Sequence, residues 1–143
     1  DKLDLIEENV ERLKLANVEI NCQDATEYMA EQEEKADVVI ADLPCSGLGI
    51  MGRKNDIKYR VTEDQIRSLV ELQHMILQNA CRYVKADGTL LYSTCTITKE
   101  ENILQVKRFL KEHPEYILKE QRQFLQGIDA CDGFYYAVLC RQR

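Results

Sequence analysis

Two cysteines stand where a thiol could take part in chemistry. Cys45 comes shortly after the apolar run Val-Val-Ile-Ala at residues 38–41, with Asp42 between them, and Cys95 follows the largely apolar residues 90–94. Short apolar runs that end at Pro, Gly or polar residues are typical of buried strands that open into loops. Because ligands bind at the carboxyl ends of strands in open α/β sheets, Asp42, Cys45 and Cys95 are candidate functional residues. A thiolate there would be a strong nucleophile.

Most of the other cysteines are expected to be inert. The chain contains Cys22, Cys45, Cys81, Cys95, Cys131 and Cys140. No two of them form a C-x-x-C pair and no His stands near them, so no metal site is expected. The α/β pattern and the absence of a signal peptide indicate a reducing cytoplasm, which disfavours disulfides. We expect Cys22, Cys81 and Cys140, which lie within apolar patterns, to be small buried hydrophobic side chains.

Composition and charge limit the class of protein. The 143 residues are 45% hydrophobic, which suits one domain with its own core. No apolar run approaches a membrane span and the first residues are not a signal peptide, so we expect a cytoplasmic chain without membrane contact. The formal net charge of −6 disfavours a free-standing nucleic-acid-binding protein, but it leaves open an enzyme that binds nucleic acid locally. The chain begins without Met, so we expect a fragment.

Helix and strand patterns alternate along most of the chain. Amphipathic spacing predicts helices over residues 3–15, 26–34, 63–84 and 99–112. Strand patterns cover residues 18–22, 38–41, 89–93, 116–124 and 134–140. No helix separates the last two strands, so they are expected to pair as an antiparallel hairpin. The order predicts an α/β fold whose sheet is mainly parallel and ends in this antiparallel hairpin.

Capping boxes predict where two of the helices begin. In each, a Thr is followed three residues later by Gln or Glu, at Thr62 and Gln65 and again at Thr98 and Glu101. A helix that begins directly after Thr98 would direct its partial positive charge toward Cys95. Such a charge favours the thiolate form of a cysteine.

One stretch of this acidic chain is basic. Residues 50–61 contain Arg53, Lys54, Lys58, Tyr59 and Arg60. A solvated loop and a loop that faces phosphates both fit this composition, because Lys and Arg contacts to phosphate dominate nucleic-acid affinity. The position directly after the Cys45 loop favours the phosphate-facing interpretation. Tyr59 is a weaker candidate for stacking on a base.

Three motifs together resemble the RNA cytosine-C5 methyltransferases. They are Asp42-Leu43-Pro44-Cys45-Ser46-Gly47-Leu48-Gly49, Ser93-Thr94-Cys95-Thr96-Ile97 with Glu100-Glu101-Asn102, and Asp132-Gly133-Phe134. Their order and spacing run through nearly the whole chain and are most similar to the bacterial Sun-type (RsmB-like) enzymes that methylate 16S ribosomal RNA. The resemblance implies a Rossmann-like fold, S-adenosylmethionine (SAM) as the cofactor and RNA of the small ribosomal subunit as the partner.

The resemblance also implies roles for single residues. Cys95 would attack cytosine C6, Cys45 would assist release of the product, and Asp42 would hold the base near N3 and N4. Asp24, Asp42 and Pro44 would contact SAM, with Asp24 at the adenine end. From the residues alone, Asp24 fits a turn or helix cap equally well.

The sequence also departs from the family pattern. It contains no G-x-G-x-x-G loop for SAM, and by the resemblance we expect residues 1–143 to lack the first strands of the fold and the N-terminal RNA-binding domain. We therefore expect residues 1–143 to be a partial methyltransferase catalytic domain that is incomplete alone. A tRNA substrate and a catalytically silent binding or structural module stay open, as does the oligomeric state. An amino-group methyltransferase is disfavoured, because that class typically has an aromatic residue at the position of Cys45.

Overall fold

The computed structural model describes residues 2–54 and 56–143, and its elements largely follow the predicted order. The helices are α1 (Lys2–Arg12), α2 (Ile57–Arg60), α3 (Glu63–Tyr83) and α4 (Ile103–Glu112), with 3₁₀ turns η1 (Ala30–Gln32) and η2 (Leu48–Ile50). The strands are β1 (Ala36–Asp42), β2 (Val84–Thr94), β3 (Tyr116–Phe124) and β4 (Phe134–Arg141).

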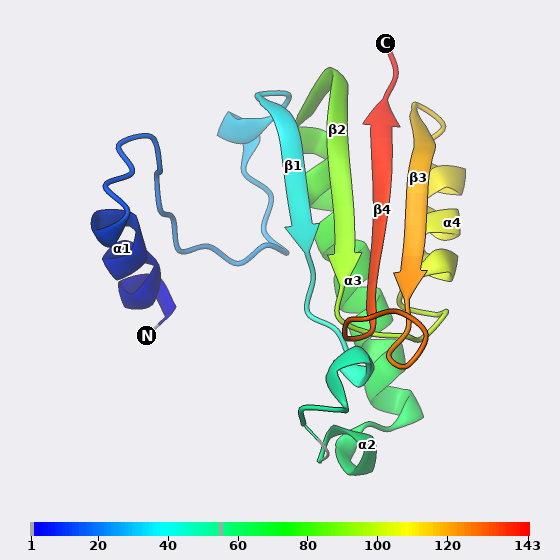
Figure 1. The fold of residues 1–143 in the computed structure, drawn as a ribbon. Helices are drawn as coiled ribbons and strands as arrows, with labels where there is room; N and C mark the ends of the chain where they lie inside the picture. Colours follow the sequence, from blue (N-terminus) through cyan, green and yellow to red (C-terminus); the bar gives the residue numbers. More distant parts are fainter. Residues whose placement is uncertain (1, 55) are drawn as a thin grey trace.

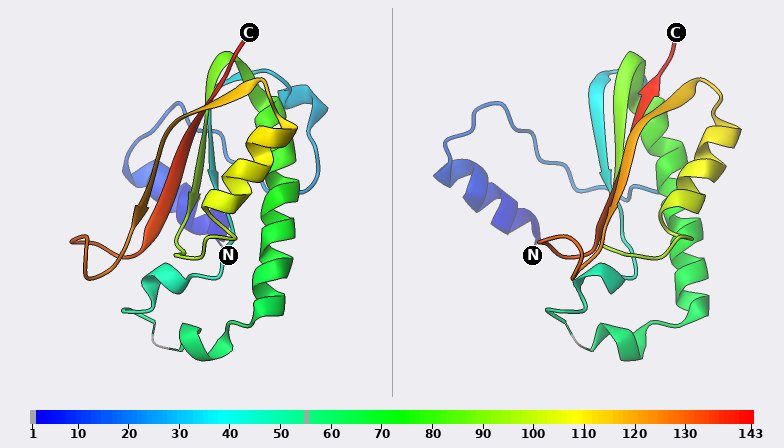
Figure 2. Two further views of the ribbon diagram at one scale, coloured as in Figure 1. Left: turned by 90° about the vertical axis from the view of Figure 1, so that its right-hand side faces the viewer. Right: turned by 45° about the vertical axis from the view of Figure 1, so that its right-hand side comes forward.

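The four strands form one mixed sheet in the order β1-β2-β4-β3. β1 runs parallel to β2, whereas β4 is antiparallel to both of its neighbours. α3 and α4 lie against the same face of this sheet (Figures 1 and 2). The α/β class and the C-terminal hairpin are therefore confirmed. Parallel pairing among the described strands is limited to β1 and β2, which is less than the sequence predicted.

The core lies between the sheet and the two helices. Leu77 of α3, Phe109 of α4, Leu90 of β2 and Leu139 of β4 are all completely buried. These residues come from the apolar stripes of the helices and from one face of the strands, as the periodicity predicts. None of the described helices is long and apolar enough to cross a membrane.

The first capping box is confirmed. The Thr62 hydroxyl accepts a hydrogen bond from the Gln65 backbone at 3.3 Å, and the Gln65 side chain accepts one from the Thr62 backbone at 3.0 Å. These two bonds satisfy backbone donors that the first turn of α3 would otherwise leave unpaired. The start of α3 is thus determined by residues adjacent in the sequence.

The second capping box does not start a helix where the sequence predicted. Thr98 accepts from the Glu101 backbone, at 3.4 Å, but α4 begins only at Ile103. The Glu101 carboxylate turns into the interior, where it accepts hydrogen bonds from several buried donors, instead of returning to the Thr98 backbone. The helix N-terminus expected directly after Thr98 is therefore not available to favour a thiolate at Cys95.

The N-terminal third of the chain differs most from the prediction. Residues 18–22 form no strand, and within the described chain no strand lies beside them to accept their backbone hydrogen bonds. Cys22 is consequently exposed, and its predicted burial is wrong, whereas Cys81 is buried as expected and Cys140 is partly buried. The helix predicted over residues 26–34 is reduced to η1.

α1 lies apart from the sheet and buries none of its residues (Figures 1 and 2). On β1, the side chains of Val38 and Ile40 are 59% and 68% exposed, while Val39 packs against the core. Alternation along the strand therefore places Val38 and Ile40 on the face that α3 does not cover.

Substitution of Leu77 tests the position of the core. Leu77→Ala should lower the free energy of unfolding by about 2–5 kcal/mol, because it removes buried methyl groups and leaves a cavity. Met75→Ala, at a position 49% exposed on the same helix, is the control and should change that free energy by less than about 1 kcal/mol. Urea unfolding followed by circular dichroism measures both. Equal destabilisation by the two variants would contradict the packing described above.

Candidate active site

The parallel pairing of β1 with β2 brings the two cysteine loops to one edge of the sheet. Asp42, the last residue of β1, lies opposite Ser93 of β2. The Leu43 backbone donates to the Ser93 carbonyl at 3.1 Å, which extends the pairing one residue beyond the strand. Both loops leave at this edge (Figure 1), and the Sγ atoms of Cys45 and Cys95 are 3.3 Å apart. Candidate residues far apart in the sequence are thereby brought together.

A close backbone contact at Gly49 joins all three sequence motifs. The Gly49 amide donates to the Cys95 carbonyl at 3.0 Å, and its carbonyl accepts from the Gly133 amide at 2.8 Å. A Cβ atom on Gly49 would lie 2.0 Å from the Gly133 carbonyl oxygen, which leaves no room for a side chain. Gly49 therefore connects the Cys45 loop both to the Cys95 loop and to the start of β4.

Burial shifts the pKa of Cys45. Desolvation, followed by its hydrogen bond with Cys95, raises the pKa of the Cys45 thiol to about 12. Cys45 therefore keeps its proton at neutral pH. Next to it, Asp42 is exposed at the strand end and accepts a hydrogen bond from the Ser93 hydroxyl at 3.1 Å.

A buried polar cluster beneath the cysteines was not predicted from the sequence. Glu101 and Gln73 are completely buried. Glu101 accepts from the Ser46 amide at 2.8 Å and from the Ser46 hydroxyl at 2.6 Å. Gln73 donates to Glu101 at 3.1 Å and to the Pro44 carbonyl at 2.9 Å. Gln73 occupies a core position on the apolar stripe of α3, and a polar residue at such a position was the one available signal.

A cavity of about 480 Å³ opens beside Cys45. It is lined by Cys45, Ser46, Val61, Asp64, Gln65, Ser68 and Leu69. The cavity therefore lies between the cysteine loop and the first two turns of α3, at the same edge of the sheet as the thiol pair. Among the described residues, no group of three or more His, Cys, Asp or Glu side chains is arranged to hold a metal ion.

The basic residues lie outside this cavity, and two of them are paired with acids. Arg53 contacts Asp132 at 2.9 Å and Arg60 contacts Asp56 at 3.4 Å. These pairs reduce the local positive charge that the sequence indicated. Lys54 and Tyr59 are exposed. The side chain of Lys58 lies outside the described residues, as does all of residue 55. RNA binding by this cluster stays a prediction.

The proposed cofactor contacts fall into two places. Asp24 is exposed and accepts from the Thr26 backbone at 2.8 Å and the Thr26 hydroxyl at 2.7 Å, which lowers the pKa of its carboxyl. These are the hydrogen bonds of a turn, the alternative role that the sequence allowed for Asp24. Asp24 also lines a pocket of about 200 Å³ that includes Met29 and Ile76. Pro44 is exposed directly after the end of β1, so its ring is accessible at the same edge as Asp42.

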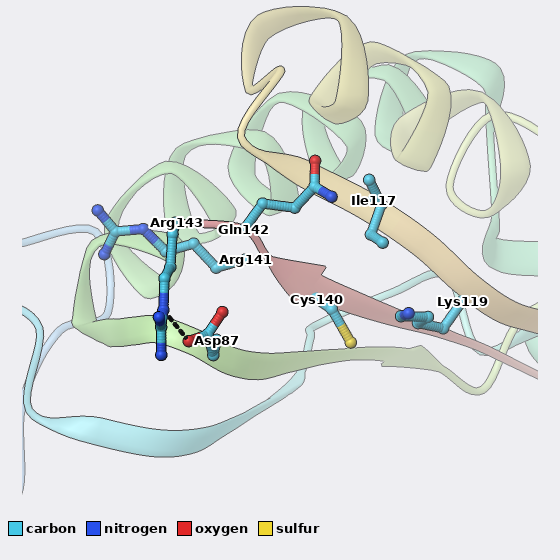
Figure 3. A pocket seen from close by; sticks show the side chains of 7 residues that line it. All are labelled: Asp87, Ile117, Lys119, Cys140, Arg141, Gln142 and Arg143. Carbon is cyan, nitrogen blue, oxygen red and sulfur yellow. Dashed lines mark hydrogen bonds and ion pairs between the residues drawn. The ribbon is translucent and has the colours of Figure 1, made fainter.

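Another cavity, of about 550 Å³, lies elsewhere (Figure 3). It is lined by Asp87, Ile117, Lys119, Cys140, Arg141, Gln142 and Arg143. This is the end of the sheet where β4 finishes, opposite the carboxyl ends of β1 and β2 (Figure 1). Arg143 is paired there with Asp87 at 2.6 Å. Neither cysteine of the 3.3 Å thiol pair lines this cavity, so it is separate from the candidate active site.

Comparison with known proteins identifies related sequences. The family model described as 16S rRNA methyltransferase RsmB/F matches residues 1–140. The ribosomal RNA small subunit methyltransferase B of Vibrio cholerae is 42% identical, over 99% of this chain and 34% of that protein. The probable ribosomal RNA small subunit methyltransferase B of Bacillus subtilis is 39% identical, over 80% of this chain and 26% of that protein. The chain thus spans about a third of the length of such relatives.

Solved structures share the fold. The crystal structure of PH0851 superposes with a TM-score of 0.92 at 31% identity, over 99% of this chain and 34% of that chain. NSun6 from Pyrococcus horikoshii, solved with SFG, has a TM-score of 0.81 at 24% identity, over 99% of this chain and 39% of that chain. SFG is an analogue of SAM. The second likeness supports the Rossmann-like methyltransferase fold alone.

The raised pKa of Cys45 can be tested by alkylation. At neutral pH, iodoacetamide should modify Cys45 more slowly than the exposed Cys22 and Cys131, because only a thiolate reacts readily. The rate at Cys45 should keep rising with pH above the usual cysteine pKa of about 8.5, because burial raises the pKa of this thiol. Mass spectrometry of each cysteine peptide measures these rates. A rate at Cys45 that levels off near the usual cysteine pKa of about 8.5 would contradict the assignment.

Proposed function

The chain belongs to the RsmB/F family of 16S rRNA methyltransferases, and from this premise we propose that it carries the thiol-bearing part of an active site. That site would transfer a methyl group from SAM to C5 of a cytosine in RNA, with 16S rRNA as the substrate. One observation carries the proposal: two thiols from separate loops lie 3.3 Å apart at a strand edge that also presents Asp42.

The first step requires a nucleophile. C5 of cytosine is a poor nucleophile until a group adds to C6, which makes C5 enamine-like, and a thiolate is well suited to this addition. Burial raises the pKa of the Cys45 thiol, which disfavours its thiolate form. We therefore assign the bond to C6 to Cys95 and a different role to Cys45.

Release of the product reverses the addition. When bound, SAM supplies the methyl group as an electrophile. The C5 proton then leaves to a base, the bond between C6 and sulfur breaks, and its electron pair returns to Cys95. The Cys45 thiol, 3.3 Å away, donates a hydrogen bond to the Cys95 sulfur as this negative charge develops.

We assign Asp42 to binding the cytosine ring. Its exposed carboxylate accepts from the cytosine 4-amino group and from a protonated N3, which draws electrons from C6 and favours addition there. The Ser93 hydroxyl, 3.1 Å from the carboxylate, limits the orientations that Asp42 can adopt. The orientation of the base is thereby coupled to the strand that delivers Cys95.

Cofactor and RNA contacts are proposed from exposure and chemistry. The Asp24 carboxylate, beside the apolar side chains of Met29 and Ile76, suits an adenine ring with its exocyclic amine. Asp42 and Pro44 are accessible at the strand edge. No G-x-G-x-x-G loop occurs in residues 1–143, so we infer that these residues alone bind SAM weakly and are inactive alone.

RNA would approach from the side of residues 50–61. The proposed phosphate contacts are Arg53, Lys54, Lys58 and Arg60, with Tyr59 stacking on a base. Tyr59 is 81% exposed, which leaves its ring accessible to a nucleotide. Contact with phosphate would compete with the Arg53–Asp132 and Arg60–Asp56 pairs, in both of which the arginine side chain is largely exposed.

The nucleophile is tested with RNA that contains 5-fluorocytosine. Fluorine at C5 cannot leave as a proton does, so the adduct should persist through denaturing electrophoresis of the native polypeptide that contains this chain. Cys95→Ala should abolish the adduct, and Cys22→Ala, at an exposed cysteine outside the site, is the matched control. An adduct of unchanged amount in Cys95→Ala would rule out Cys95 as the nucleophile.

The role of Cys45 is tested with unmodified RNA. Cys45→Ala should let a covalent protein–RNA adduct accumulate, because the residue that assists release is missing while the nucleophile is intact. The adduct is measured by its shift on a denaturing gel, and turnover by transfer of labelled methyl groups. Turnover at the wild-type rate without an adduct would remove Cys45 from the mechanism.

A further inference from the structure

The Glu101 carboxylate is the centre of the buried cluster beneath the cysteines. It is completely buried, and no cation contacts it among the described residues. Its donors are the Ser46 amide (2.8 Å), the Ser46 hydroxyl (2.6 Å), the Thr98 hydroxyl (2.7 Å), the Gln73 amide (3.1 Å) and the Thr96 hydroxyl (3.3 Å). A buried carboxylate is tolerated only with such compensation. Its two oxygens offer about four acceptor sites, more than any neutral side chain provides.

Two of the residues that donate to Glu101 directly follow the two cysteines in the sequence. Ser46 directly follows Cys45, and Thr96 directly follows Cys95. The Ser46 and Thr96 hydroxyls lie 2.7 Å apart, and both bond to the same oxygen of Glu101. The two loops are therefore joined one residue beyond each thiol.

Gln73 holds the other side of the Cys45 backbone. Its amide group donates both to the Pro44 carbonyl, at 2.9 Å, and to Glu101. The backbone before and after Cys45 is thus tied to one buried pair of side chains. Because Glu101 also reaches Thr96, a displacement of its carboxylate would move the Cys45 loop relative to Cys95.

We propose that Glu101 is a positioning residue that sets the separation of the Cys45 and Cys95 sulfurs through Ser46 and Thr96. The inference rests on the proposed function for its catalytic consequence, because a reaction that uses two thiols in turn requires them at a defined distance. The effect of Glu101 on the distance between the two sulfurs does not depend on that function.

Two conservative pairs of variants separate positioning from mere folding. Glu101→Gln keeps the shape but removes the charge and acceptor sites. Thr96→Val removes the hydroxyl that joins the loops, and Thr96→Ser restores it. In the native polypeptide that contains this chain, Glu101→Gln and Thr96→Val should lower kcat about 10- to 100-fold with KM for RNA unchanged. Thr96→Ser and the exposed control Glu100→Gln should resemble the wild type.

A second readout needs no RNA. Hydrogen peroxide oxidises two nearby thiols to a disulfide: two S–H bonds break, one S–S bond forms, and the peroxide is reduced to two waters. The disulfide between Cys45 and Cys95 should form readily in the wild type and about tenfold more slowly in Glu101→Gln and Thr96→Val. Peptide mapping under non-reducing conditions measures the rate.

The two readouts distinguish the possible failures. If the variants form the disulfide more slowly but the wild type does not methylate cytosine, the proposed function is overturned and the positioning role stays in place. Disulfide formation and kcat unchanged in both Glu101→Gln and Thr96→Val would overturn the positioning role. If Glu101→Gln does not fold, the comparison of Thr96→Val with Thr96→Ser decides.

Discussion

Parallel pairing of β1 with β2 in a single register is the constraint on which the candidate site depends. With Asp42 opposite Ser93, both strands end at the same edge and their loops leave side by side. A slip of one residue would turn every side chain of β1 to the other face of the sheet. It would also separate the loops, so the bonds from Gly49 to Cys95 and from Ser46 to Glu101 could not form. The local contacts of the site therefore follow from the strand register.

The site uses similar groups in different environments. Asp42 is exposed with one hydroxyl partner, whereas Glu101 is buried among five donors. The exposed carboxylate is accessible to a ligand, and the buried one holds the loops. Burial also acts on the thiols, because it raises the pKa of Cys45 and keeps that sulfur protonated. Differences in burial, more than differences in residue type, thus separate the carboxylate that is accessible to a ligand from the carboxylate that holds the loops.

Local patterns predicted much of the fold and part of the site. The hairpin, β1 and the Thr62 cap depend on neighbouring residues, so periodicity and capping rules identified them. The meeting of Cys45 and Cys95 followed from both lying at strand ends.

Residues 18–22 alternate like a strand, but a strand needs a hydrogen-bonding partner, which sequence alternation does not reveal. Glu101 has the spacing of a capping residue, and that spacing is the same whether its carboxylate caps a helix or enters the core. The Arg53–Asp132 pair joins residues far apart in the chain and leaves no local signal.

The backbone contact between Gly49 and Gly133 has a consequence for the order of folding. It joins the loop after β1 to the residue just before β4, across more than half of the chain. Contacts of such long sequence separation form late, because closing a long loop costs entropy before any contact compensates for it. β4 also lies between β2 and β3 in the sheet. During synthesis, the Cys45 loop therefore reaches its final arrangement only after the last strand of this chain has been made and inserted.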